Sequence, residues 1–166
     1  GVRDLTIITP SRWLAGLVKD SFLKDYNIKV INNGINLDHF KPTIGDFRKK
    51  NKLENKFVIL GVASKWTKRK GFDYFLKLSE EITHSDKIVL VGVTEQQFKE
   101  LPDNIIGIRR TEKISDLAEM YSMADVFINP TLEDNFPTTN IEALACGTPV
   151  ITFDTGGSTE SIDSRC

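Results

Sequence analysis

The stretch "KFVILGVAS" (56–64) decides the fold class, because it is apolar at almost every position. A strand with one face in water alternates apolar and polar side chains, whereas a strand covered on both faces is apolar throughout. This stretch is therefore predicted to be a buried strand of a parallel sheet. "KIVLVGV" (87–93) repeats the pattern, and further strands are predicted at 104–110, 125–130 and 150–154.

Helix-like segments separate these strands. "GFDYFLKLSEEIT" (71–83) has apolar residues at helical spacing, and further helices are predicted at 94–101, 115–124 and 138–147. Alternating strands and helices predict an α/β fold with a doubly wound parallel sheet. If the five strands are numbered along the chain, we expect the spatial order 3-2-1-4-5. In such a sheet a ligand binds at the switch point, outside the carboxyl ends of the first and fourth strands.

A shorter α/β unit is predicted ahead of this sheet. It consists of a strand at 5–11, a helix at 12–26 that Ser11 caps, and a strand at 28–34. The polar stretch 36–56 is predicted to be a linker with one short helix. Because the chain starts in a strand without an initiator Met, we interpret it as part of a longer protein.

The composition excludes several classes of protein. The chain has 166 residues, 40% of them hydrophobic, and a formal net charge of -1, so its charge balance does not indicate a nucleic-acid-binding protein. Its two cysteines make no disulfide framework, which predicts a cytoplasmic location. No apolar run approaches the roughly 20 residues that span a bilayer.

Familiar cofactor motifs are also absent. "GVASKW" (61–66) lacks the further glycines of the G-x-G-x-x-G pattern, which argues against a nicotinamide site. No P-loop pattern occurs, and neither histidine has metal-ligand spacing with cysteines or acidic residues. No metal site is therefore predicted.

Charged side chains follow the two strands that flank the predicted switch point. "SKWTKRKG" brings Lys65 and Lys70 after the first strand, and "TLEDNFPTTNIE" brings Asp134 and Glu142 after the fourth. Lysines facing the amino end of a helix suit a diphosphate, because the free N–H groups and the helix dipole favour anionic oxygens. A carboxylate one turn into that helix suits the paired hydroxyls of a ribose, and one in the loop suits a sugar.

Simpler interpretations of the same residues remain open from the sequence. The basic run can be a solvated loop, Glu142 a surface residue of its helix, and Asp134 an ordinary turn former. The joint position of all these charges at the predicted switch point favours a ligand site.

A family resemblance supports the ligand site. "DNFPTTNIEALACGTPVI" (134–151), followed by "TGGSTESI" (155–162), resembles the donor-binding half of retaining glycosyltransferases of family 4. These have the GT-B architecture of two Rossmann-like domains and carry an E-x7-E motif, which Asp134 and Glu142 match in spacing. Lys65 and Lys70 match the family's Arg/Lys pair in spacing, and "INNGIN" (31–36) resembles the segment at its domain junction.

The resemblance implies roles for these residues. Glu142 would bind the ribose of a nucleotide-sugar donor, Lys65 and Lys70 would neutralise the leaving diphosphate, and Asp134 would contact the transferred sugar. Neither a metal nor another cofactor is expected, because the lysines and the helix dipole stabilise the developing charge. The backbone near sugar and phosphate would be that of Asn135, Phe136 and Thr138, and the base would lie near Arg110, Thr111 or Lys113.

The resemblance also implies a division of the chain. Residues 1–40 would be the end of the acceptor domain and the interdomain linker, and residues 41–166 a donor-binding domain truncated at its C-terminal end. The whole enzyme would transfer a sugar to a glycan or lipid-linked acceptor through the missing N-terminal domain, with peripheral association at the inner face of the membrane. This portion alone is predicted to be inactive. Two alternatives remain: a nucleotide-sugar epimerase of GT-B-like fold, and a non-catalytic module used for interaction.

Overall fold

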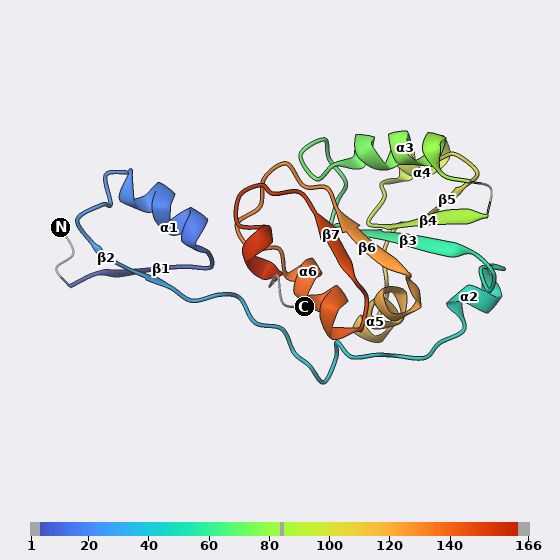
Figure 1. Ribbon diagram of the computed structural model, residues 1–166, viewed down its shortest axis with the longest axis horizontal. Helices are drawn as coiled ribbons and strands as arrows, with labels where there is room; N and C mark the ends of the chain where they lie inside the picture. Colours follow the sequence, from blue (N-terminus) through green and yellow to red (C-terminus); the bar gives the residue numbers. More distant parts are fainter. Residues whose placement is uncertain (1–3, 84, 163–166) are drawn as a thin grey trace.

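The computed structural model describes residues 4–83 and 85–162, which form two α/β units joined by an extended segment (Figure 1). In the smaller unit, two parallel strands pair with Thr6 opposite Asn27, and a helix connects them. Its elements are β1 (Thr6–Thr9), α1 (Arg12–Lys19) and β2 (Asn27–Val30).

Helix α1 begins as the sequence predicts but ends early. The Ser11 side chain accepts a hydrogen bond from the Leu14 N–H at 3.1 Å, which confirms the predicted cap. The prediction that the helix continues to residue 26 is wrong, because it ends at Lys19. The Ser21 hydroxyl donates to the Val18 carbonyl at 2.7 Å, and such a local bond competes with a further helical turn.

The larger unit is a five-stranded parallel sheet with the order β5-β4-β3-β6-β7, which confirms the predicted topology. The central strand is buried from Val58 to Leu60, as a strand covered on both faces must be. Hydrogen-bonded register places Ile59 between Ile88 of β4 and Val126 of β6. The strands are β3 (Phe57–Val62), β4 (Asp86–Val91), β5 (Ile105–Ile108), β6 (Val126–Asn129) and β7 (Val150–Thr152).

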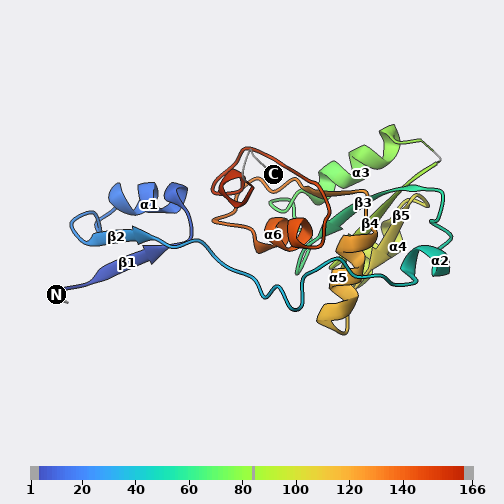
Figure 2. The same ribbon diagram turned by 60° about the horizontal axis from the view of Figure 1, so that its bottom comes forward.

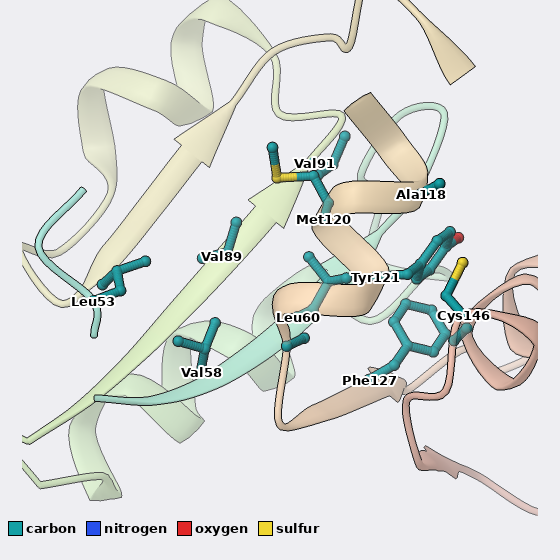
Figure 3. Packing of buried hydrophobic residues seen from close by; sticks show 12 residues of the cluster. Leu53, Val58, Leu60, Val89, Val91, Ala118, Met120, Tyr121, Phe127 and Cys146 are labelled. Carbon is teal, nitrogen blue, oxygen red and sulfur yellow. The ribbon is translucent and has the colours of Figure 1, made fainter. Parts of the chain in front are cut away.

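Helices cover both faces of this sheet (Figures 1 and 2). One face packs on α3 through Phe75, and the other packs on α5 and α6 through Tyr121 and Ala143. Figure 3 shows part of the second core, where Tyr121 lies beside Phe127 of β6. The helices are α2 (Phe47–Lys50), α3 (Phe72–Glu81), α4 (Glu95–Glu100), α5 (Ile114–Met123) and α6 (Thr138–Ala145), followed by the short 3-10 helix η1 (Thr159–Ser161).

The two units contact one another through η1 and the start of α1, which lie side by side in both views (Figures 1 and 2). The Glu160 carboxylate accepts hydrogen bonds from the backbone N–H groups of Arg12 at 2.8 Å and Trp13 at 2.9 Å. These N–H groups lie in the first turn of α1 and have no partner within the helix. A side chain of the larger unit thus caps the helix of the smaller one.

Candidate functional site

Two adjoining hollows open at the carboxyl ends of the central strands, where the sequence places the switch point. The larger hollow has a volume of about 670 Å³ and the smaller about 320 Å³. They share the wall formed by Val62, Ala63, Ser64 and Thr139. The end of β3 and the first turn of α6 therefore separate two compartments of one site.

Two glycines allow the chain to pass close beneath this site. Gly92, after β4, has a φ of +95°, and a Cβ there would lie 1.7 Å from the Ala63 carbonyl oxygen. Gly71, before α3, has a φ of +83°, and its Cβ would lie 2.3 Å from the Pro130 carbonyl oxygen. Both positions require glycine, because L side chains avoid this backbone region and a Cβ has no room.

Lys70 and Asp134 meet at the smaller hollow. The Lys70 ammonium lies 2.6 Å from the Asp134 carboxylate, and both side chains are largely covered. The two loops that carry them are tied together, because Arg69 donates to the Glu133 carbonyl at 2.6 Å and its own carbonyl accepts from Leu132 at 2.8 Å. The fold thus brings together a cation and a carboxylate that are 64 positions apart in sequence.

The Gly-Gly pair after β7 supports the loop that carries Asp134. The Gly157 N–H donates to the Asp134 carbonyl at 2.8 Å. A Cβ at Gly157 would lie 1.9 Å from the Asn135 carbonyl oxygen, and one at Gly156 would lie 2.4 Å from that of Asp134. Only residues without a side chain fit this close approach of two backbones.

The amino end of α6 lies at the smaller hollow. Phe136, Pro137, Thr138 and Thr139 line it, and Pro137, at the N-cap position, makes no side-chain capping bond. The first N–H groups of a helix have no acceptor within the helix, and they carry the positive end of its dipole. An anion in the smaller hollow would therefore meet this helix end and the Lys70 ammonium together.

Glu142 lines the larger hollow one turn further along α6. Its Oε2 accepts a hydrogen bond of 2.8 Å from the Tyr121 hydroxyl. Burial raises the pKa of Tyr121 well above its usual value, and the charge of Glu142 and the hydrogen bond to it raise this pKa further. Tyr121 is therefore a neutral donor to the carboxylate over the whole physiological range.

The three residues predicted near a base also line the larger hollow. Arg110, Thr111 and Lys113 lie on the segment between β5 and α5, facing the same hollow as Glu142. The structure thus places the residues predicted to lie near the base in the same hollow as the residue predicted to bind the ribose.

Two predicted residues lie apart from the hollows. Lys65 is exposed and lines neither of them, whereas its neighbour Trp66 is buried and donates to the Val91 carbonyl at 2.8 Å. Asn135 is also exposed, and its carbonyl packs against Gly157. Of the predicted cation pair, only Lys70 is at the smaller hollow.

Two polar groups at the site are not among the residues predicted from the sequence. Asn129, at the end of β6, lines the smaller hollow and donates to the buried Asn140 side chain at 2.9 Å. Tyr121 was also missed, although a buried tyrosine needs a partner for its hydroxyl. An asparagine ending an apolar strand and a tyrosine on the apolar face of a helix were the available signals.

The described residues, 4–83 and 85–162, contain no group of three or more His, Cys, Asp or Glu side chains placed to hold a metal ion. They also contain no helix that is long and apolar enough to cross a bilayer.

Comparison with known proteins identifies the family. The family model described as "Glycosyl transferases group 1" matches residues 54–165, which is most of the chain. The chain belongs to this family. The predicted membership of a glycosyltransferase family and the predicted Rossmann-like fold of GT-B C-terminal domains are confirmed, and the retaining subclass stays a prediction.

One relative and two solved structures show what this group 1 chain is similar to. Over 61% of its length it is 32% identical to alpha-galactosylglucosyldiacylglycerol synthase of Streptococcus pneumoniae, covering 29% of that protein. The crystal structure of Anabaena HepE in complex with UDP-glucose has a TM-score of 0.79 at 19% identity, over 95% of this chain and 47% of that one. The C-terminal domain of the group 1 protein LpcC from Francisella tularensis has a TM-score of 0.62 at 20% identity, over 79% and 76%. The chain thus spans less than half of the first two proteins.

Proposed function

We propose that this chain is the donor-binding part of a retaining glycosyltransferase. The whole enzyme would transfer a sugar from a nucleotide-diphosphate sugar to a glycan or lipid-linked acceptor. The observation that carries the proposal is the pair of joined hollows, with Glu142 in one and Lys70 with Asp134 in the other. The UDP-glucose bound to Anabaena HepE and the glycolipid named in the S. pneumoniae relative support the chemical class.

The donor would span both hollows. Its ribose hydroxyls would bind Glu142 in the larger hollow, with the base near Arg110, Thr111 and Lys113. Its diphosphate would lie at the amino end of α6, where the first N–H groups of the helix and the Lys70 ammonium attract anionic oxygens.

The sugar would lie beyond the diphosphate, near Asp134. The backbone of Asn135, Phe136 and Thr138 would surround the sugar and the phosphates, while Pro137 has no N–H to contribute. Asp134 is held beside Lys70, so one carboxylate oxygen faces the cation that also serves the diphosphate.

During transfer the bond between the anomeric carbon and the diphosphate oxygen would break, the oxygen of an acceptor hydroxyl would bond to that carbon, and the hydroxyl proton would pass to the leaving diphosphate. The bonding electrons leave with the nucleoside diphosphate. Lys70 and the α6 dipole would stabilise this charge, with Lys65 as a second cation, so that no metal or other cofactor is required.

The proposed division of the chain follows the family. Residues 1–40 would end the acceptor domain and form the linker, and residues 41–166 would belong to the donor domain. The extended segment between β2 and α2, and the similarity to an isolated C-terminal domain, support this division. Acceptor binding and activity would need the rest of the protein, which we propose to be cytoplasmic and peripherally associated with the inner face of the membrane.

Binding of nucleotides to this chain tests the donor site. A ligand that binds only the folded state raises the melting temperature, and at 100 times its Kd it adds about 2.7 kcal/mol of stability. We expect one of UDP, GDP or ADP, or its sugar conjugate, to do so in a thermal-shift screen. Glu142→Ala should reduce the shift strongly, whereas Glu80→Ala, on the exposed face of α3, should preserve it.

Two results would contradict the donor site: no shift with any nucleotide, or an undiminished shift in Glu142→Ala. A transferase and an epimerase differ in what the full-length protein makes from a nucleotide sugar. Release of nucleoside diphosphate that depends on an acceptor indicates transfer, and an epimeric sugar product indicates epimerisation.

A further inference from the structure

The hydrogen bond between Tyr121 and Glu142 joins α5 to α6 beside the larger hollow. Among the described residues, Tyr121 is the side chain that hydrogen-bonds the Glu142 carboxylate, at 2.8 Å from Oε2. The Tyr121 side chain is completely buried, while Glu142 borders the larger hollow. A neutral buried donor thus contacts a carboxylate that borders the larger hollow.

The Tyr121 ring has little freedom to move. It packs edge-on against Phe127 with ring centroids 5.4 Å apart, and against Phe40 at 6.2 Å (Figure 3 shows the contact with Phe127). The Tyr121 carbonyl accepts the Thr148 hydroxyl at 2.5 Å, which ties α5 to the turn after α6. The hydroxyl is therefore presented to Glu142 from a fixed position.

A fixed donor constrains how the carboxylate is oriented. A glutamate on a helix surface can rotate about three side-chain bonds, and a long side chain loses conformational entropy when it is ordered. The bond to Tyr121 orders Glu142 before a ligand arrives and leaves Oε1 to accept hydrogen bonds in the larger hollow. Preorganisation of this kind increases affinity by removing part of the ordering cost from the binding step.

Resting on the proposed donor site, we propose that Tyr121 is a positioning residue that sets the Glu142 carboxylate for ribose hydroxyls. It thereby controls the discrimination between ribonucleotides and deoxyribonucleotides. Orientation of Glu142 increases affinity only when the ligand offers a hydroxyl to this carboxylate. A 2′-deoxy or 3′-deoxy nucleotide that lacks the contacted hydroxyl therefore gains no affinity from the orientation.

The test is Tyr121→Phe, which keeps the ring and removes only the hydroxyl. Titration calorimetry measures Kd for the nucleoside diphosphate that the wild type binds, and for its 2′-deoxy and 3′-deoxy analogues. We expect the ribonucleotide to bind up to about tenfold more weakly, because the cost of ordering one long side chain returns to the binding step. Binding of the analogue that lacks the contacted hydroxyl should change less than about twofold. Tyr74→Phe, on α3, is the matched control and should leave all three constants unchanged.

A double-mutant cycle shows whether Tyr121 acts through Glu142. In a Glu142→Ala background, Tyr121→Phe should have no further effect on any Kd, because the partner is gone. Equal weakening of all three ligands by Tyr121→Phe, or an unchanged preference for ribose, overturns the proposal. If Glu142→Ala abolishes that preference while Tyr121→Phe retains it, the donor site stands and the positioning role fails. If the wild type binds no nucleotide, both fail.

Discussion

The Lys70 ammonium and the Asp134 carboxylate form an ion pair of 2.6 Å, with side chains that are 28% and 18% exposed. The pair lies between two loops that are themselves hydrogen-bonded through Arg69. Lys70 is therefore oriented by its ion-pair partner at the wall of the smaller hollow. In the proposed donor site a diphosphate would compete with Asp134 for this cation, so that phosphate and sugar contacts would depend on each other.

Lys70→Ala should weaken binding of a nucleoside diphosphate by about tenfold or more, because a charge-assisted hydrogen bond is lost. The corresponding nucleoside monophosphate and nucleoside should be affected less, since Lys70 lies at the smaller hollow and the proposed ribose site in the larger one. Titration calorimetry of the three ligands measures this gradient. Lys68→Ala, in the same loop but exposed, is the control. Equal weakening of all three ligands would refute a diphosphate role for Lys70.

Gly157→Ala should destabilise the protein by about 2 kcal/mol or more, in the range of overpacking at a closely packed position. The new methyl group would lie 1.9 Å from the Asn135 carbonyl oxygen and 2.8 Å from the Ser11 Cβ. Neither atom can move away by a side-chain rotation, because one is a backbone atom and the other is bonded directly to the backbone. Urea unfolding measures the change. Gly16→Ala, within α1 and with open space around it, should instead be neutral or stabilising. A Gly157→Ala protein as stable as the wild type would contradict the close approach of the two segments.

Glu160→Ala should loosen the start of α1 without affecting the large sheet. It removes the acceptor for the Arg12 and Trp13 N–H groups, and loss of a helix cap costs about 1 kcal/mol. Hydrogen exchange at these two amides should then be roughly fivefold faster, while exchange in β3 stays as in the wild type. Glu80→Ala is the matched control on α3. Unchanged protection at both amides would show that this contact does not hold α1.

The sheet was predictable because burial on both faces leaves a direct record in the sequence. Stretches such as 88–93 have no polar side chain, and the alternation of strands and helices then limits the topology to few possibilities. The end of α1 was not predictable from the apolar pattern, because the hydrogen bond from Ser21 to the Val18 carbonyl determines it. Local polar bonds of this kind are not visible in hydrophobic periodicity.

The site was predictable where chain topology alone determines position. Lys70, Asp134 and Glu142 follow strand ends that a parallel sheet must bring together, and they lie at the two hollows. Which lysine of the basic loop faces the hollow depends instead on the burial of Trp66, and Lys65 is exposed. The contribution of Tyr121 depends on the packing of α5 against α6, and spacing within one helix carries no signal for it.

The raised pKa of Tyr121 predicts how the free energy of unfolding depends on pH in the alkaline range. Burial first, and then the charge and hydrogen bond of Glu142, raise its pKa well above the usual value of about 10. Above pH 10 the unfolded chain releases this proton while the folded protein retains it. The free energy of unfolding therefore falls as pH rises, by up to about 1.4 kcal/mol per pH unit from this group. Below pH 9 the group contributes no pH dependence.

Comparison of the wild type with Tyr121→Phe isolates this contribution. The ionisable groups facing the ring are Glu142 and Cys146, both on the α6 side, and burial also raises the pKa of Cys146. The cysteine therefore adds a loss of stability of the same sign from about pH 9, but the variant retains Cys146, so the difference removes it. Urea unfolding at pH 8, 9, 10 and 11 should show parallel behaviour up to pH 9 and a steeper loss in the wild type above pH 10. Curves that stay parallel to pH 11 would show that Tyr121 ionises as readily in the folded protein as in the unfolded chain.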